Sequence, residues 1–180
     1  WPALFLKSQP PAYRREVWPT PDGGEIAVDY VDGDAGAPLV VLFHGLEGSS
    51  YSHYASALMH AVKARGWRGV VPHFRGCGGQ PNLLRRAYHA GDAAEIDWIL
   101  QRLAAGNTVL FVVGVSLGGN MLLRYLGEHG ARALPRAAAA ISAPLDLAAA
   151  STCLDRGVGR HHSPRMFHNT LQPQSLAQLD

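Results

Sequence analysis

The stretch Phe111–Asn120, FVVGVSLGGN, decides the fold. Its apolar, β-branched run stops at a serine with glycines two positions before and after it, so that Gly114–Gly118 fits the pattern G-x-S-x-G. This pattern is typical of a serine on a sharp turn between a strand and a helix, where only small neighbours let the adjoining chains approach. We therefore predict a buried strand, an exposed Ser116 hydroxyl and a helix from about Leu117. The alternative is an ordinary glycine-rich turn with a capping serine.

Predicted strands and helices alternate along the rest of the chain. The periodicity predicts strands at Glu25–Val31, Leu39–His44, Trp67–Phe74, Thr108–Val115 and Ala137–Ser142, and helices at Ser52–Arg65, Asp92–Gly106 and Leu117–Gly130. The proline-rich opening, residues 2–21, predicts an extended arm on the surface. This order is typical of the α/β class, with a mostly parallel sheet and helices on both faces. The loop after the first buried strand lacks G-x-G-x-x-G, which argues against a dinucleotide site.

Composition limits the possible functions. The 180 residues suffice for one domain with one core, and the apolar fraction of 47% is that of a globular protein. The formal net charge is +2 and the basic residues are scattered, so we expect no nucleic-acid partner. Two cysteines, Cys77 and Cys153, are too few for a disulfide framework, and no apolar run reaches the ~20 residues that span a membrane. We therefore expect a cytoplasmic protein without a transmembrane segment.

A second glycine-bearing loop, HGLEG at residues 44–48, follows the strand predicted at Leu39–His44. Where a nucleophilic serine lies on a strand-to-helix turn of this kind, two backbone N–H groups stabilise the oxyanion that forms when the serine attacks a carbonyl group. One comes from such an earlier loop and one from the residue after the serine. Leu46 and Leu117 are then the expected donors. His44 belongs to the loop and precedes the serine, so we expect it to fix the loop rather than to act as a base.

Three blocks of the sequence together resemble the YheT-like branch of the α/β-hydrolase superfamily. They are FHGLEGSSYSHY at 43–54, PHFRGCGGQPN at 72–82 and GVSLGGNMLLRYLGEHG at 114–130. The resemblance covers nearly the whole chain. It implies a cofactor-free serine carboxylesterase acting on medium-chain esters, acylglycerols or phospholipids, with Ser116 as nucleophile, and it leaves hydrolysis and acyl transfer both open. The residues that we expect to line the pocket are His44, Gly45, Glu47, Arg75 and Cys77. A nucleophilic Cys77 is the weaker alternative.

A nucleophilic serine needs a histidine base and an acid that orients it. In the chain order serine, acid, histidine, the sequence offers Asp146 with His161, His162 or His168. The alternative is that Asp146 caps a short helix, and the resemblance favours this, because SAPLDLAAA (142–150) matches the start of the family's cap region. The resemblance implies that the acid and the histidine follow the seventh and eighth strands instead. No cysteine or carboxylate stands at ligand spacing around the three histidines, so we expect no metal.

We expect residues 1–145 to form the N-terminal and central part of an α/β-hydrolase core without its last two strands, and residues 146–180 to begin the cap. The strand near Ala137–Ser142 then becomes an open edge of the sheet. Such an edge predicts either low stability of this chain alone or cover from another segment, including a second copy of the chain. Without a triad, the alternative function is a non-catalytic domain that binds an acyl ligand or a partner.

Overall fold

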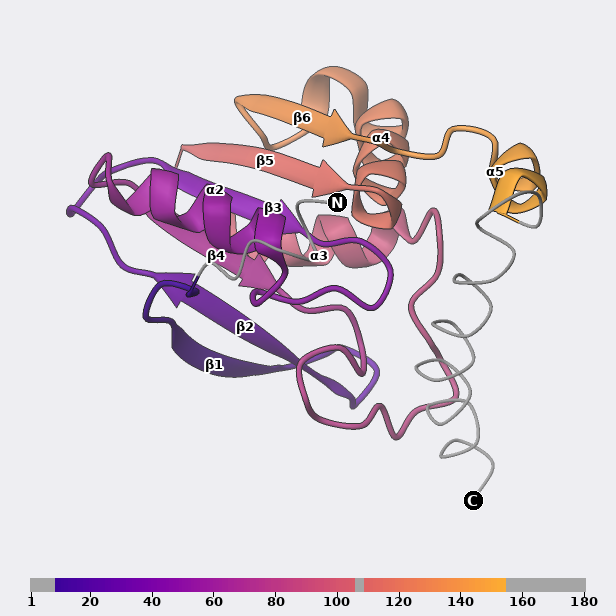
Figure 1. The fold of residues 1–180 in the computed structure, drawn as a ribbon, viewed down its shortest axis with the longest axis horizontal. Helices are drawn as coiled ribbons and strands as arrows, with labels where there is room; N and C mark the ends of the chain where they lie inside the picture. Colours follow the sequence, from indigo (N-terminus) through magenta and orange to yellow (C-terminus); the bar gives the residue numbers. More distant parts are fainter. Residues whose placement is uncertain (1–8, 106–108, 155–180) are drawn as a thin grey trace.

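One twisted sheet organises the protein, and Figure 1 shows its strands side by side. The computed structural model describes residues 9–105 and 109–154. Within them the strands are β1 (Arg14–Pro19), β2 (Glu25–Val31), β3 (Leu39–Phe43), β4 (Arg68–Pro72), β5 (Leu110–Val115) and β6 (Ala137–Ile141), in the order β1-β2-β4-β3-β5-β6. Strands β4, β3, β5 and β6 are parallel, whereas β1 pairs antiparallel with β2, and β2 with β4. The predicted α/β class with a mostly parallel sheet is confirmed.

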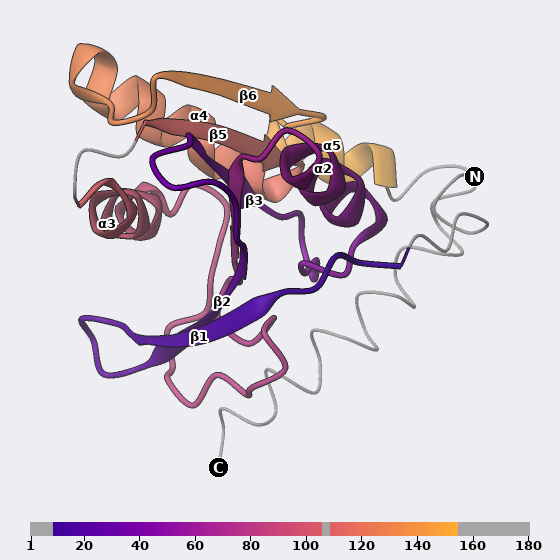
Figure 2. The same ribbon diagram turned by 90° about the vertical axis from the view of Figure 1, so that its left-hand side faces the viewer.

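Helices cover both faces of the sheet, as predicted. They are α2 (His53–Lys63), α3 (Ala93–Ala104), α4 (Leu117–His129), the 3₁₀ helix η1 (Gly130–Arg132) and α5 (Leu147–Leu154). Figure 2 shows α2 on one side of the sheet and α3 on the other. The larger hydrophobic core includes side chains of α3 and α4, and the smaller core includes side chains of α2.

Strand β3 shows why the central strands read as unbroken apolar runs. All five of its residues are buried. Successive side chains of a strand point to opposite faces, so Val41 and Phe43 enter the larger core while Leu42 enters the smaller one. A strand that is covered on both faces cannot alternate between polar and apolar residues.

The N-terminal segment departs from the prediction. The expected surface arm contains β1, which pairs with β2 from Arg14↔Tyr30 to Pro19↔Glu25. Its Trp18 side chain is buried in the larger core. Pro19 is the last residue of an edge strand, where its missing N–H breaks no ladder. The prolines around this segment obscured a six-residue strand.

Strand β6 is the edge strand at the other side of the described sheet, and all five of its residues are exposed. This confirms the predicted open edge for the part of the chain that the structure describes. The proposed boundary after residue 145 stays a prediction, since the second part is described only over residues 146–154. None of the helices in residues 9–105 and 109–154 has the length and apolar character of a transmembrane span.

The order of the strands around β3 brings two loops together at one edge of the sheet. From β3 the chain passes to β4 on one side, and then returns to β5 on the other side of β3. In such sheets a crevice opens beyond the carboxyl ends of the strands at the reversal. The loop after β3 and the turn after β5 therefore meet at one edge.

Candidate active site

Ser116 forms the turn between β5 and α4. It follows Val115, the last residue of β5, and precedes Leu117, the first residue of α4. Its backbone has φ 51° and ψ −114°, a strained conformation for a residue with a side chain. Its N–H donates to the Ile141 carbonyl at 2.8 Å, and its carbonyl accepts from the Asn120 N–H at 3.0 Å. The strain and the turn are those that the G-x-S-x-G pattern predicts.

The flanking glycines let α4 approach β3. A Cβ on Gly118 would lie 2.4 Å from the Phe43 carbonyl oxygen, and a Cβ on Gly114 would lie 2.5 Å from the Gly118 carbonyl oxygen. The Gly118 N–H donates to the His44 carbonyl at 3.2 Å. Glycine at these two positions is thus required by close backbone approach, and the first turn of α4 rests on the end of β3.

The loop after β3 lies directly against the serine. A Cβ on Gly45 would lie 3.3 Å from Ser116 Cβ. The loop closes as a turn, in which the Gly48 N–H donates to the Gly45 carbonyl at 2.9 Å. Among the described residues, no hydrogen-bond acceptor is assigned to the N–H of Leu46 or of Leu117. The structure thus brings together the segments that carry both expected oxyanion donors.

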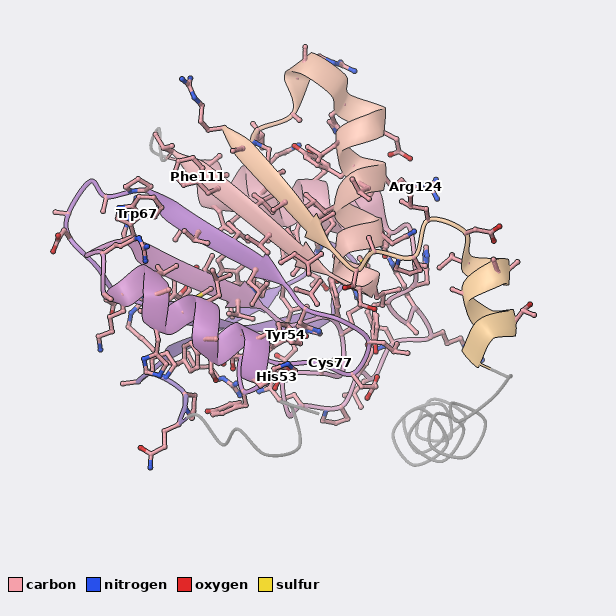
Figure 3. The ribbon with its side chains drawn as sticks, turned by 45° about the horizontal axis from the view of Figure 1, so that its top comes forward. His53, Tyr54, Trp67, Cys77, Phe111 and Arg124 are labelled. Carbon is pink, nitrogen blue, oxygen red and sulfur yellow. The ribbon has the colours of Figure 1, made fainter. Side chains whose placement is uncertain are left out.

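Tyr54 fixes the start of this loop. Its hydroxyl accepts the Gly45 N–H at 2.9 Å, and a Cβ on Gly48 would lie 2.6 Å from the same oxygen. Figure 3 shows Tyr54 and Cys77 at one end of the sheet, and Trp67 and Phe111 toward the other. Tyr54 falls within the helix predicted at Ser52–Arg65, and nothing in the sequence indicated its contact with the loop.

His44 is fully buried at the end of β3. Its Nε2 accepts the Phe74 N–H at 3.0 Å, so the ring proton is on Nδ1, which donates to the Gly45 carbonyl at 2.7 Å. Burial lowers the pKa of His44 to about 3. Both nitrogens are occupied and the ring is neutral, which fits a residue that fixes the loop rather than a base.

The surroundings of Arg75 and Cys77, two of the expected pocket residues, suggest structural roles for their side chains. The Arg75 guanidinium is buried, and it donates to Glu95 Oε2 at 2.7 Å and to Asp22 Oδ1 at 3.1 Å. Cys77 is half-buried, and burial raises the pKa of its thiol to about 12. A thiol with that pKa is protonated near neutrality, so Cys77 is a poor nucleophile. The role of both residues in lining a pocket stays a prediction.

The proposed triad partners are only partly described. Asp146 is exposed, and it accepts the Ala149 N–H at 2.9 Å at the start of α5, so it makes the helix-capping contact. His161, His162 and His168 lie outside the described residues. Asn120 Nδ2 donates to the Pro144 carbonyl at 2.8 Å, which ties the segment before Asp146 to the first turn of α4. No group of three metal-ligating side chains occurs among the described residues.

Comparisons with known proteins agree with this geometry. A family model described as the alpha/beta hydrolase fold matches residues 38–176. The chain is 39% identical over 186 residues to the Escherichia coli protein YheT, a candidate esterase, and this match spans 99% of the chain and 54% of YheT. It is 31% identical to the phospholipase ABHD3 of Homo sapiens, over 84% of the chain and 40% of that protein. The chain thus spans about half the length of these relatives.

Solved structures share the fold. The esterase Pf2001 of Pyrococcus furiosus superposes with a TM-score of 0.67 at 17% identity, over 91% of this chain and 63% of that one. The serine hydrolase XC6422 of Xanthomonas campestris superposes with a TM-score of 0.61 at 17% identity, over 77% of this chain and 65% of that one. At such low identity the likeness concerns the fold alone. The Ser116 turn, the sheet order and the match over residues 38–176 together show that the chain belongs to the α/β-hydrolase family.

Proposed function

We propose that the protein is a serine hydrolase of carboxylic esters and that Ser116 is its nucleophile. The observation that carries the proposal is the strained Ser116 turn with the Gly45 loop in contact with it. The relatives named as phospholipase and monoacylglycerol lipase support an ester with an acyl chain as the substrate class.

In the proposed reaction, Ser116 Oγ attacks the ester carbonyl carbon while its proton passes to a base. The carbonyl oxygen becomes an oxyanion, which the N–H groups of Leu46 and Leu117 hold. The N-terminal end of α4 adds partial positive charge at this place. The intermediate collapses as the C–O bond to the alcohol oxygen breaks and the base gives that oxygen the proton taken from Ser116, so the neutral alcohol leaves and an acyl-enzyme remains. Water then attacks the acyl carbon through a second oxyanion and frees the serine and the acid.

The base in this scheme is a histidine held by an acid. Among the described residues, no side chain is assigned a hydrogen bond to Ser116 Oγ. Asp146 with His161, His162 or His168 is one possible pair. The resemblance to YheT-like hydrolases favours instead a pair that follows two further strands.

A fluorophosphonate probe tests the proposal in the full-length protein, because the probe reacts only with an activated serine. We expect stoichiometric labelling and hydrolysis of p-nitrophenyl esters. Ser116→Ala should abolish the labelling and lower turnover by at least ~10³-fold. Thr152→Ala, at an exposed hydroxyl in α5, should leave both unchanged. A series of acyl chain lengths then defines the preferred ester.

The second candidate function is a non-catalytic domain that binds an acyl ligand. It is favoured by the lack of a described base beside Ser116. Absence of labelling and of ester turnover, together with saturable binding of a fatty acyl ligand, would select this candidate and reject the enzyme.

A further inference from the structure

Glu47 has an unusual backbone for its position. The turn from Gly45 to Gly48 places Glu47 third, with φ 52°. A turn with positive φ at its third residue is of type II, and it prefers glycine or asparagine there. The peptide that joins Leu46 to Glu47 is therefore held in an orientation that the glutamate itself does not favour.

One hydroxyl contacts Glu47 at two points. The Tyr88 hydroxyl accepts the Glu47 N–H at 3.2 Å and donates to Glu47 Oε1 at 2.5 Å. The N–H contact fixes the peptide after Leu46, and the carboxylate contact fixes the side chain. Tyr88 reaches this loop from the long segment between β4 and α3, 41 residues away in the chain.

Tyr88 is itself held rigidly. Its ring stacks on Phe74, with the ring centres 5.4 Å apart and the planes at 18°. Phe74 in turn stacks on Phe43, at 6.3 Å and 8°. Phe43 ends β3, so this aromatic column connects the hydroxyl to the strand that carries the loop. Burial, with the nearby thiol of Cys77, raises the pKa of Tyr88, so the hydroxyl keeps its proton and remains a donor.

We propose that Tyr88 is a positioning residue, whose hydroxyl holds the Gly45–Gly48 turn in the conformation that presents the Leu46 N–H to Ser116. The inference rests on the proposed function. An oxyanion donor contributes most when it is held in place before the charge develops. Without the hydroxyl, the turn can relax to negative φ at Glu47, and only a fraction of the molecules then has a competent site.

Tyr88→Phe in the full-length protein tests the proposal. We expect kcat for ester hydrolysis to fall about tenfold or more, with KM changed less than about twofold, because both oxyanions lose stabilisation while the ground state does not. Exchange of the Glu47 amide proton should accelerate. Adding Glu47→Gly should restore part of kcat, since glycine adopts positive φ without strain.

The matched control is Tyr125→Phe, which removes a tyrosine hydroxyl that accepts a backbone N–H, that of Leu134 at 3.0 Å, away from the serine. It should lower thermal stability and leave kcat unchanged. Wild-type kcat in Tyr88→Phe would overturn the proposal, and so would unchanged Glu47 exchange. If the wild-type protein neither labels nor hydrolyses esters, the proposed function fails instead, and Glu47 exchange alone decides whether Tyr88 holds the turn.

Discussion

Replacing Gly118 with alanine should push the first turn of α4 away from β3. The new Cβ would lie 2.4 Å from the Phe43 carbonyl oxygen and 2.5 Å from that of His44. A carbon ordinarily stays ~3.3 Å or more from a carbonyl oxygen, so the helix end must move by about 1 Å. Neither obstacle is a flexible side chain that can turn aside, because both are backbone atoms of β3 and its loop.

The displacement has two expected consequences. The Leu117 N–H and Ser116 move relative to the Gly45 loop, and a misplacement of ~1 Å at a reacting group lowers the rate by about 10²-fold. Forcing a methyl group into a filled site costs ~1–3 kcal/mol of unfolding free energy. For a protein of this size that corresponds to a fall in Tm of ~2–12 °C.

The same helix offers a matched control. A Cβ on Gly127 meets nothing within 4 Å, so Gly127→Ala should stabilise α4 by up to ~1 kcal/mol without affecting the site. The measurements are the second-order rate of fluorophosphonate labelling and the midpoint of thermal unfolding. If Gly118→Ala has the labelling rate and the unfolding midpoint of the wild type, close contact of α4 with β3 does not determine the position of Ser116.

Two further predictions concern buried charge. Burial lowers the pKa values of His44 and His73 to about 3 and about 4, and unfolded histidine titrates near ~6.5. As the pH falls, these two histidines are therefore protonated in the unfolded chain before they are protonated in the folded protein. From about pH 6 toward pH 4, the unfolding free energy measured by urea titration should fall by about 1.4 kcal/mol per pH unit for each histidine. An unfolding free energy that does not change over this pH range would contradict the prediction. Arg75→Ala removes the nearer counter-ion of the buried Glu95, leaves it only the Arg86 guanidinium at 3.9 Å, and should lower the unfolding free energy by ~3–5 kcal/mol. Arg14→Ala, which breaks two exposed ion pairs, should lower it by less than ~1 kcal/mol.

The fold was largely readable from local patterns. Strands buried on both faces produce unbroken apolar runs, and the start of α3 has a capping residue, Asp92, whose side chain accepts the Glu95 N–H at 3.3 Å. Strand β1 was missed although it forms a hairpin with the next strand, β2, because the prolines in and around it resemble those of a surface arm. Sequence periodicity reports burial along a segment, but it does not report the partner that creates the burial.

The sequence predicted the residues of the candidate site only where the backbone geometry allows a single residue type. Close backbone contacts at positions 114 and 118 tolerate only glycine, so the glycine spacing in the sequence was enough to predict the Ser116 turn. Tyr54 and Asn120 each act through one hydrogen bond, across 9 and 24 residues, and Tyr88 acts through two hydrogen bonds to Glu47, across 41 residues. Many residue types could occupy these positions in other folds, so nothing local distinguishes them.

The serine turn is coupled to the exposed edge of the sheet. The Ser116 N–H donates to the Ile141 carbonyl of β6, and all five residues of β6 are exposed. An apolar groove of about 540 Å³ runs beside this strand, lined in part by Trp67, Phe111 and Ala138. Association through this edge stays a prediction, but the coupling has a direct consequence. A contact that restrains β6 also restrains the Ile141 carbonyl, which accepts the Ser116 N–H. A partner or segment that covers β6 should therefore also hold the Ser116 turn more firmly in position.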